Sequence, residues 1–303
     1  MRPEMAQAKR RPAVDRRQFS PHYCPTSYPD LLPNMKIATW NINSVRLRID
    51  SVKRFLKEEA PDVLCLQEIK CKDDQFPAKA LKAAGYAHQA VSGQSGYHGV
   101  AIVSRLPLDD VEKKGFCEKD DCRHIAASLP GGVRVHNFYV PAGGDEPDPA
   151  VNEKFAHKLD FMRGMAAWLA NGAAPSKTKA ILVGDLNIAP REHDVWSHKQ
   201  LLTVVSHTPV EVALMDAAID SGGWTDVARA LVPEPEKLYT WWSYRARDWR
   251  ASNRGRRLDH IWVSPALKKA ATGGGRAAFA IHDRCRGWSK PSDHVPVTLA
   301  LSL

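Results

Sequence analysis

The chain has 303 residues, of which 44% are hydrophobic and 25% are charged, and it carries a formal net charge of +9. This composition excludes a chain that is disordered throughout, and the length fits one large globular domain or two modest ones. The positive charge makes a polyanion such as nucleic acid a natural partner, although charge by itself is a weak signal.

The cysteines suit neither a disulfide framework nor structural zinc. They stand at positions 24, 65, 71, 117, 122 and 285, with no CxxC pair and no histidine at zinc-finger spacing. Such cysteines are typical of reduced thiols in a cytoplasmic protein. No apolar run approaches the roughly 18 residues of a membrane span, and the N-terminus has no apolar core of a secretory signal. We therefore expect a cytoplasmic protein without a membrane partner.

Residues 1–34 differ in composition from the rest of the chain. They contain several prolines and clustered arginines, and they show neither helical nor strand periodicity. We expect a flexible basic N-terminal extension that could contact DNA without sequence preference. Ordered structure is expected to begin at Met35, which could also be the translation start. Residues 35–303 are then expected to form a single domain.

From residue 35 onward, strand patterns alternate with helical patterns. Short apolar stretches predict strands at residues 36–42, 62–68, 99–104 and 133–140. A helix with one apolar face is expected between the first two strands, and it ends before Pro61. A second helix is expected to end at Gly85.

The second half of the chain continues this alternation. A longer helix is predicted over residues 150–170, because apolar side chains recur there on one face. These side chains are Phe155, Leu159, Met162, Ala166 and Leu169. Strands are predicted at residues 180–185, 258–264, 277–283 and 296–303. The pattern indicates a layered α/β protein, with one mixed sheet or two packed sheets between helices.

Acidic and amide side chains stand where the predicted strands begin or end. They are Asn41, Glu68, Asp185 with Asn187, Asp259, and the pair Asp293 and His294. In a mixed sheet, the ends of some strands and the starts of others share one edge, so these side chains could meet. Asp and Asn are also common in turns and helix caps, so any one of them alone fits a loop. Five such places together favour a site for a hard cation such as Mg²⁺, which prefers oxygen ligands.

Six motifs in order resemble those of the exonuclease III family of abasic-site endonucleases. They are WNINSVR, LQEIK, FYVPAGG, GDLNIAP, RRLDHIWVS and SDHVPV, with YTWWSYR between the fourth and the fifth. The resemblance extends from Met35 to Leu303. GDLN and SDH are shared with the wider endonuclease, exonuclease and phosphatase superfamily, whereas the whole series resembles the bacterial exonuclease III branch. The resemblance implies a single catalytic domain with a four-layer α/β sandwich similar to DNase I.

The resemblance also implies an activity. It implies hydrolysis of the phosphodiester on the 5' side of an abasic site in duplex DNA, which leaves a 3'-hydroxyl. It further implies 3'-5' exonuclease and 3'-phosphatase activity. Duplex DNA with abasic sites or blocked 3' ends is the implied partner of a monomeric enzyme. Mg²⁺ is the implied cofactor, with Mn²⁺ as a substitute.

The catalytic roles that the resemblance carries over fall on the residues at the strand ends. Asp185 would deprotonate the attacking water, and Asn187 would donate a hydrogen bond to the phosphate. His294 would donate to a phosphate oxygen, with Asp259 fixing its tautomer and favouring its protonated form. Tyr139 would contact the same phosphate. The implied metal-binding set is Asn41, Glu68, Asp185, Asn187, Asp293 and His294.

Substrate recognition falls on the aromatic and basic segment before Asp259. Trp241 and Leu258 would line an apolar pocket for a sugar without its base, whereas Trp242 would pack in the core. Arg123 matches an arginine that grips the DNA backbone in the family. The arginines of this segment that are expected to meet phosphates are Arg254, Arg256 and Arg257.

One position departs from the family pattern. Ala142 stands where many relatives carry an amide side chain that contacts the phosphate. Either that contact is missing, or backbone N–H groups of Gly143 and Gly144 replace it. Two other functions stay open: another phosphoesterase of the superfamily, such as a non-specific nuclease or a lipid or inositol phosphatase, and a nucleic-acid-binding regulator without catalysis. The complete set of acids argues against the regulator.

Overall fold

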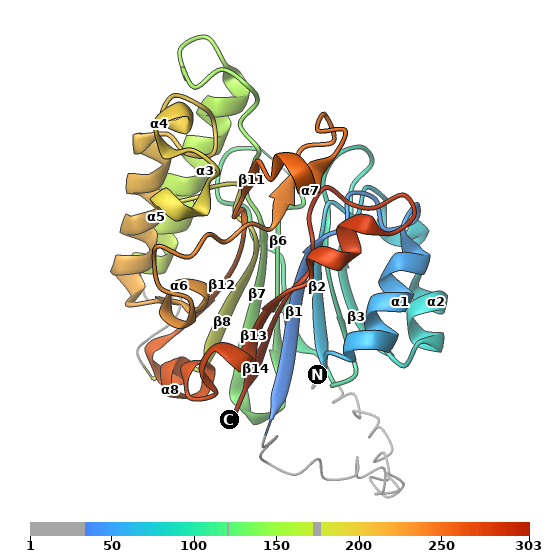
Figure 1. Ribbon diagram of the computed structural model, residues 1–303. Coiled ribbons are helices and arrows are strands. Elements are labelled where there is room, and N and C mark those ends of the chain that lie inside the picture. Colours follow the sequence, from blue (N-terminus) through green and yellow to red (C-terminus); the bar gives the residue numbers. More distant parts are fainter. Residues whose placement is uncertain (1–33, 120, 172–176) are drawn as a thin grey trace, which may run out of the picture. The chain divides into compact units, whose positions relative to one another are not determined.

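The computed structural model describes residues 34–119, 121–171 and 177–303. Residues 1–33, which hold almost all of the expected basic extension, lie outside the described residues. The described chain forms two six-stranded sheets, a two-stranded ribbon and flanking helices (Figure 1). None of its helices combines the length and the apolar character needed to cross a membrane.

The first sheet has the strand order β13-β14-β1-β2-β4-β3. In it, β1 runs parallel to β2, whereas β14 runs antiparallel to β1 and β4 antiparallel to β2. The strands are β1 (Met35–Asn41), β2 (Val63–Gln67), β3 (His88–Ser92), β4 (Val100–Ser104), β13 (Phe279–Ile281) and β14 (Val297–Leu301). The sheet is therefore mixed, as the sequence predicts.

The second sheet has the strand order β5-β6-β7-β8-β12-β9. In it, β7 and β8 are parallel, and β12 is antiparallel to β8. The strands are β5 (Asp109–Glu112), β6 (His124–Leu129), β7 (Val133–Tyr139), β8 (Ala180–Asp185), β9 (Thr225–Asp226) and β12 (Asp259–Val263). Strands β10 (Trp241–Trp242) and β11 (Gly255–Arg256) form the separate antiparallel ribbon.

Helices cover the outer face of each sheet (Figure 1). On the first sheet, α1 and α2 contribute Phe55 and Leu81 to a cluster that includes Trp40 of β1. On the second sheet, α3 and α5 contribute Met162 and Met215 to a cluster that includes residues of β7, β8 and β12. The helices are α1 (Ile49–Glu59), α2 (Ala78–Ala83), α3 (Glu153–Ala170), α4 (His198–Leu201), α5 (Pro209–Gly222), α6 (Val227–Leu231), α7 (Trp249–Ser252) and α8 (Lys268–Thr272).

The two sheets pack against each other through their inner faces. Ile37 of β1, Val135 of β7 and Val183 of β8 belong to this central cluster. Their neighbours in sequence point the other way, so Ala38 contacts the helices outside the first sheet. Because both faces of the central strands are covered, strands such as β4 and β8 read as continuous apolar runs. The order of layers is helix, sheet, sheet, helix, and the predicted four-layer α/β sandwich is confirmed.

The last strands begin and end at different residues from those expected. The pair Asp293 and His294 lies in a loop before β14 and does not open that strand. The amide of Val295 donates to the carbonyl of Thr240, 2.8 Å away, so this loop pairs with the segment before the ribbon. Pro296 follows and has no amide for the ladder, so β14 begins one residue later. The strand expected at 277–283 shortens to β13, because a 3-10 helix occupies Gly275–Ala278.

Candidate active site

Three predicted site residues lie in one row at the edge of the second sheet. Tyr139 at the end of β7 is the register partner of Asp185 at the end of β8. Asp185 is in turn the partner of Asp259 at the start of β12. Partners across a ladder face the same side of the sheet, so the phenol and both carboxylates point the same way.

Gly184 allows β7 and β8 to approach each other just before Asp185. Its φ is 144°, and a Cβ atom there would lie 1.9 Å from the carbonyl oxygen of Phe138. A side chain cannot occupy that space, so only glycine fits. Close packing against β7 therefore explains why glycine precedes Asp185 in the GDLN motif. It also lets Asp185 pair in register with Tyr139.

Asn41 and Glu68 reach this row from the first sheet. Asn41 ends β1, and Glu68 directly follows β2. The Tyr139 hydroxyl donates to Oε1 of Glu68 at 2.7 Å. Nδ2 of Asn41 donates to Oε1 of Glu68 at 3.1 Å and to Oδ2 of Asp185 at 2.8 Å. The candidate site thus joins the edges of both sheets.

Two of these residues have a left-handed backbone. The φ angles of Glu68 and Asn187 are 49° and 53°. Asparagine tolerates this region better than most residues, whereas glutamate pays a cost on the order of 1 kcal/mol or more. Such outliers persist where the surrounding structure imposes them and cluster at functional sites. Asn187 contacts Asp185 directly, and Glu68 is linked to it through Asn41.

Asp185 is buried and held by three hydrogen bonds, with only 1% of its surface exposed. Besides the bond from Asn41, it accepts from the amide and from Nδ2 of Asn187 at 3.0 and 3.1 Å. Burial raises the pKa of Asp185 to about 7, with the charge of His294 opposing the rise and the charge of Asp259 adding to it. A carboxylate that changes protonation near neutral pH is suited to general base catalysis.

His294 and Asp259 form a buried pair beside Asp185. Nδ1 of His294 lies 2.8 Å from Oδ2 of Asp259, and Nε2 lies 3.7 Å from Oδ2 of Asp185. Burial disfavours the imidazolium, but the charges of Asp259 and Asp185 outweigh it and raise the pKa of His294 to about 10. Thr240 fixes the pair, because its hydroxyl oxygen accepts from the amides of Leu258 and Asp259 at 3.0 and 3.1 Å. His294 is therefore a proton donor at neutral pH.

The donor set of this region fits a hard divalent cation. Asp185, Asp259 and His294 have ligand atoms within 4.8 Å of one another. Oδ1 of Asp259 is buried, and no hydrogen-bond partner for it lies among the described residues. Glu68 adds a carboxylate whose Oε2 pairs with the ammonium of Lys70 at 2.9 Å. A cluster of carboxylates in which one oxygen has no hydrogen-bond partner suits Mg²⁺ or Mn²⁺.

Asp293 lies at the same edge but has other partners. Its Oδ1 accepts from Nδ2 of Asn43 at 3.0 Å, and its Oδ2 accepts from Nε1 of Trp241 at 3.0 Å. Burial opposes its ionisation, yet the charge of His294 and these hydrogen bonds hold the pKa of Asp293 below its usual value. Asp293 thus ties the catalytic edge to the aromatic segment.

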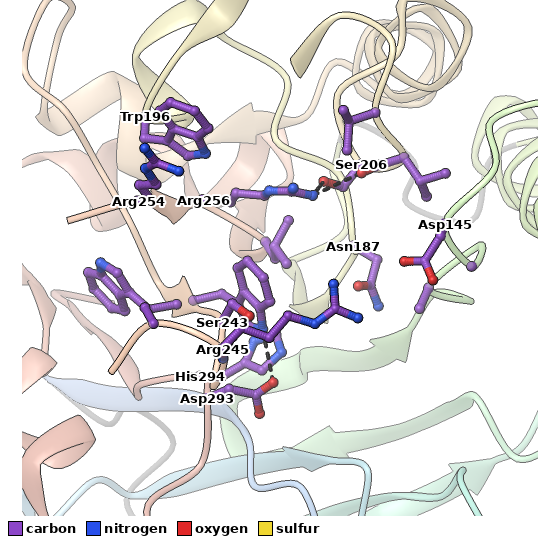
Figure 2. Close-up of a pocket in the computed structure, with 18 of the residues that line it drawn as sticks. Asp145, Asn187, Trp196, Ser206, Ser243, Arg245, Arg254, Arg256, Asp293 and His294 are labelled. Carbon is purple, nitrogen blue, oxygen red and sulfur yellow. Dashed lines mark hydrogen bonds between the residues drawn. The ribbon is translucent and has the colours of Figure 1, made fainter. Parts of the chain in front are cut away.

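A cavity of about 820 Å³ opens beside these residues (Figure 2). Trp241 and Leu258 line it together with Asn187, Asp293 and His294. Trp241 is only half-buried, whereas Trp242 is 5% exposed and packs with Tyr239 and Val295. The structure therefore brings Trp241 and Leu258 to the cavity. Trp242 also contributes to the lining, but its side chain is buried in a small core.

Arginines form part of the cavity wall. Figure 2 shows Arg245, Arg254 and Arg256 around the opening. The guanidinium of Arg256 lies 5.4 Å from the Trp241 ring, and Nη1 donates to the hydroxyl of Ser206 at 2.7 Å. The guanidinium of Arg254 lies 4.7 Å from the ring of Trp196.

Arg257 does not meet solvent, so its predicted contact with DNA phosphates is wrong. The residue is fully buried, and its guanidinium makes bidentate pairs with Asp194 and with Asp226, with N···O distances of 2.8 to 3.1 Å. Arg229 also pairs with Asp194. Arg256 ends β11, whereas Arg257 lies in the link to β12, and the sequence does not show which of these neighbours the acids of other segments enclose.

Arg123 lies behind the candidate site. It is 6% exposed, and its guanidinium lies 4.8 Å from the ring of Tyr139. Its Nη1 donates to the carbonyl of Tyr139 at 3.3 Å, its Nε pairs with Asp121, and its Nη2 lies 2.8 Å from Nδ1 of His98. In this structure the guanidinium is thus engaged with internal partners beneath Tyr139.

Sequence reasoning missed four residues around the site. Lys158 of α3 and Glu211 of α5 form a fully buried ion pair of 2.5 Å, and Nζ of Lys158 also donates to the carbonyl of Asn187 at 2.8 Å. This pair anchors the loop that carries Asn187. The other two are Lys70, beside Glu68, and Trp196, on the cavity wall. Lys70 stands inside the LQEIK motif, whereas Lys158 gave no signal because a lysine on a helix is usually exposed.

Ala142 is exposed on the cavity wall and cannot supply an amide contact. Its carbonyl oxygen accepts from Nζ of Lys158 at 3.3 Å. Gly143 follows with φ 90°, and a Cβ atom there would lie 2.9 Å from side-chain atoms of Lys158 and Val205. The glycine turn therefore packs closely against the anchor of Asn187.

Comparison with known proteins agrees with this geometry. Residues 38–294 match the model of the endonuclease/exonuclease/phosphatase family. The chain is 33% identical to exodeoxyribonuclease III of Haemophilus influenzae, over 87% of this chain and 98% of that protein.

Solved structures show the same likeness. An AP endonuclease from Archaeoglobus fulgidus has a TM-score of 0.81 and 32% identity, covering 89% of this chain and all of that one. A 3' phosphatase from Neisseria, bound to a product DNA hairpin, has a TM-score of 0.80 and 35% identity with the same coverage. The likeness therefore spans nearly the whole of both proteins.

Proposed function

The chain belongs to the endonuclease/exonuclease/phosphatase family, and on this premise we propose that it is a DNA repair nuclease of the exodeoxyribonuclease III type. It hydrolyses the phosphodiester on the 5' side of an abasic site in duplex DNA and leaves a 3'-hydroxyl. The same site trims nucleotides and blocking phosphates from 3' ends. One observation carries the proposal: carboxylates and a protonated histidine converge at a shared sheet edge, beside a cavity with a tryptophan wall.

Asp185 is the proposed general base. In-line attack on a phosphodiester needs a positioned water and a group that takes its proton. The two donors of Asn187 and the one of Asn41 hold the Asp185 carboxylate in one orientation. A pKa near neutral pH lets it accept the proton at working pH and release it after each turnover.

His294, Tyr139 and Asn187 are the proposed donors to the phosphate. Asp259 holds Nδ1 of His294, which leaves Nε2 for a phosphate oxygen on the side of Asp185. The hydroxyl of Tyr139 and Nδ2 of Asn187 face the same edge, where they now donate to Glu68 and Asp185. Donors fixed in advance stabilise the charge that develops in the transition state.

Mg²⁺ is the proposed cofactor, with Mn²⁺ as a substitute. Glu68 and Asp185 would hold the ion, with Asn41, Asn187 and Asp293 as the remaining members of the proposed set. His294 would belong to this set only in its neutral form, because both nitrogens of an imidazolium are donors. When bound, the ion would neutralise charge on the phosphate and on the departing oxygen. Asn41 can serve only if its amide turns, because its Nδ2 faces both carboxylates here.

Trp241 and Leu258 are the proposed walls for a flipped sugar that lacks its base. A flipped nucleotide costs less to extrude when no base has to be unstacked, which favours abasic DNA. Arg245 and Arg254 are exposed at the cavity and would meet the phosphates on either side. We propose that Arg123 acts from behind by orienting Tyr139, since its guanidinium contacts that residue.

The test is cleavage of a duplex that contains one abasic analogue. With Mg²⁺, the protein should nick this duplex on the 5' side of the analogue, and EDTA or Asp185→Ala should abolish the reaction. Asp160→Ala, which changes an exposed aspartate of α3, should leave it unchanged. Cleavage of an intact duplex or a soluble phosphate ester, with the abasic duplex left whole, would show instead a different phosphoesterase of the family.

We also propose that the enzyme works as a monomer in the cytoplasm. The described cysteines, Cys65, Cys71, Cys117, Cys122 and Cys285, are free, as is usual in a reducing compartment. Light scattering of the protein with and without duplex DNA should give the mass of one chain in the free state. A stable dimer would contradict this part of the proposal.

A further inference from the structure

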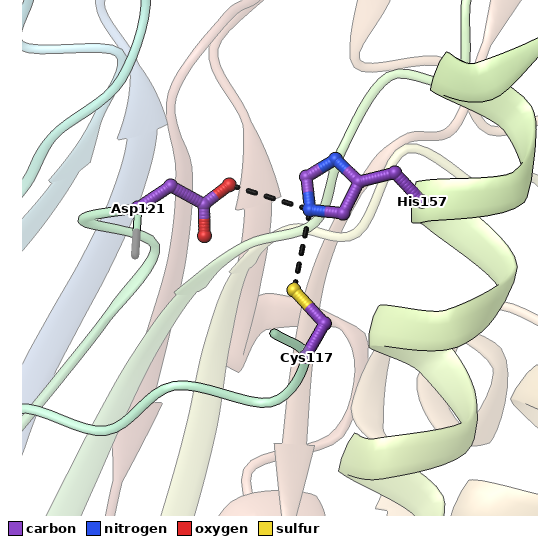
Figure 3. Close-up of side chains that lie close together, drawn as sticks. All are labelled: Cys117, Asp121 and His157. Atoms are coloured by element: carbon purple, nitrogen blue, oxygen red, sulfur yellow. Dashed lines mark hydrogen bonds and ion pairs between the residues drawn. The ribbon is translucent and has the colours of Figure 1, made fainter. Parts of the chain in front are cut away.

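A second group of ligand-type side chains lies away from the cavity (Figure 3). Cys117 and Asp121 belong to the segment between β5 and β6, and His157 belongs to α3. Sγ of Cys117 lies 3.2 Å from Nε2 of His157, and the same nitrogen lies 3.5 Å from Oδ2 of Asp121. All three ligand atoms lie within 4.8 Å of one another. None of these residues lines the cavity described above.

We propose that Cys117, Asp121 and His157 bind a divalent transition-metal ion of the zinc type. Tetrahedral zinc, with bond lengths of roughly 2.0 to 2.3 Å, separates its ligand atoms by about 3.4 to 3.6 Å. The separations of 3.2 and 3.5 Å are close to that spacing. Three protein ligands would fill three corners of the tetrahedron, which leaves the fourth for a further ligand such as one water molecule.

The thiol of Cys117 donates to the carbonyl of Lys119 at 3.9 Å, so the shorter contact of 3.2 Å between Sγ and Nε2 of His157 is not needed to satisfy the thiol. A single imidazole nitrogen either donates one proton or accepts one. If Nε2 of His157 donates its proton to Asp121, this nitrogen cannot also accept a hydrogen bond from the thiol of Cys117. If Nε2 accepts from the thiol, its lone pair faces the carboxylate. A cation between the three atoms satisfies all of them together.

The chemistry of the donors selects the metal. Thiolate and imidazole favour zinc and similar ions, whereas Mg²⁺ prefers oxygen donors. The side chains of His157 and Asp121 are only 10% and 8% exposed, so little water competes for the ion. Burial lowers the pKa of His157, so its imidazole is neutral at pH 7, the form that binds a metal.

Arg123 supplies an outer partner for this site. Its Nε pairs with the same carboxylate of Asp121, which orients that side chain. A carboxylate has about four lone-pair positions, so Asp121 can serve a guanidinium and a metal together. The bound ion would therefore connect the segment before β6 to α3.

The test uses Co²⁺ as a spectroscopic probe of the full chain under reducing conditions. With Mg²⁺ in large excess, which occupies oxygen-rich sites, one equivalent of Co²⁺ should produce the near-ultraviolet absorption of a cobalt–thiolate bond. Zn²⁺ should abolish this absorption by displacing the probe. Absence of the band in the unmodified protein would overturn the proposal.

Variants assign the band to these residues. Cys117→Ser should remove it, whereas Cys122→Ser, which changes a thiol five positions away, should keep it. His157→Gln should keep a thiolate but weaken Co²⁺ binding by more than about tenfold, since even the loss of an outer partner costs that much. A band that survives Cys117→Ser, or an affinity unchanged in His157→Gln, would place the metal elsewhere. Circular dichroism of each variant checks that it is folded.

Discussion

Two buried clusters of charged residues differ in how their charges are balanced. In the ion network, Arg257 lies between Asp194 and Asp226, and Arg229 is a second partner of Asp194. Both oxygens of Asp194 have guanidinium partners. The acid–histidine cluster consists of Asp185, Asp259 and His294, with Glu68 beside it, and Oδ1 of Asp259 has no partner among the described residues.

This difference distinguishes charges that stabilise the fold from charges that are suited to catalysis. In the ion network, burial opposes the ionisation of Asp194, but the charges of Arg257 and Arg229 hold its pKa below the usual value. In the acid–histidine cluster, burial raises the pKa of Asp185 instead. A perturbed pKa alone therefore does not mark a catalytic site. The carboxylate oxygen without a partner does, because a bound cation can balance its charge.

The largest expected effect is the loss of catalysis when the acid–histidine cluster is changed. Asp185→Asn should lower the single-turnover rate on an abasic duplex by about 10³- to 10⁴-fold, because the variant lacks a general base. The fold should survive, since the amide has the size of the carboxylate. Asp160→Asn, on the exposed face of α3, is the control. A rate within tenfold of the unmodified enzyme would remove Asp185 from the mechanism.

Changes in the ion network should affect the stability of the fold. Arg257→Met leaves the buried Asp194 and the partly exposed Asp226 without their shared partner, which should lower the free energy of unfolding by about 3–5 kcal/mol. Arg254→Met, three residues earlier and exposed, should change it by less than about 0.5 kcal/mol. Urea denaturation measures both. A loss below about 1 kcal/mol for Arg257→Met would mean that the network is not a structural anchor.

The pH dependence of stability should have opposite signs in the two clusters. The pKa of Asp185 is raised from 3.8 to about 7, so the unfolded chain binds fewer protons between these values and stability falls as pH rises. In EDTA, Asp185→Asn should therefore gain about 2 kcal/mol relative to the unmodified protein between pH 5 and pH 8.

Asp194 serves as the matched comparison for that experiment. Its lowered pKa contributes stability above the usual value of 3.8, and this contribution is lost only as pH falls through the lowered pKa. Asp194→Asn should then be destabilised by the same amount at pH 5 and pH 8. If the free energies of unfolding of both variants changed with pH in the same way, the proposed difference between the acid–histidine cluster and the ion network would be contradicted.

The neighbouring tryptophans should separate recognition from packing. Trp241→Ala should reduce the preference for abasic over intact duplex by about tenfold, or about 1.4 kcal/mol, because a wall of the sugar pocket is removed. Trp242→Ala should lower stability and leave this preference unchanged, because the ring packs with Tyr239 and Val295. Rates on both duplexes give the comparison. Equal losses on both duplexes for Trp241→Ala would refute its role in the pocket.

The smallest expected effect concerns the exposed arginines. Arg254→Ala should lower the slope of log affinity against log salt by about one, because one phosphate contact is lost. The rate at saturating DNA should not change. Arg163→Ala, on the exposed face of α3, is the control and should keep the slope. An unchanged slope in Arg254→Ala would place the DNA path away from this wall.

The sequence by itself determined the α/β class and most elements, and it predicted candidate site residues that the structure brings to one edge. Alternating apolar stretches place the strands because a covered strand must be apolar on both faces. The acids at the strand ends are visible for the same reason: a carboxylate directly after an apolar run has to lie at a sheet edge. The six motifs then imply the family and the four-layer arrangement, and the structure confirms both.

Only the tertiary structure decided which buried charges have a partner of opposite charge and which do not. Register places Asp259 opposite Asp185, and no local pattern encodes a pairing between residues so far apart in sequence. Arg256 and Arg257 look alike in the sequence, yet one borders the cavity and the other is enclosed by Asp194 and Asp226. Two adjacent arginines carry no local signal that tells them apart, and the acids that the fold brings close decide which one is buried.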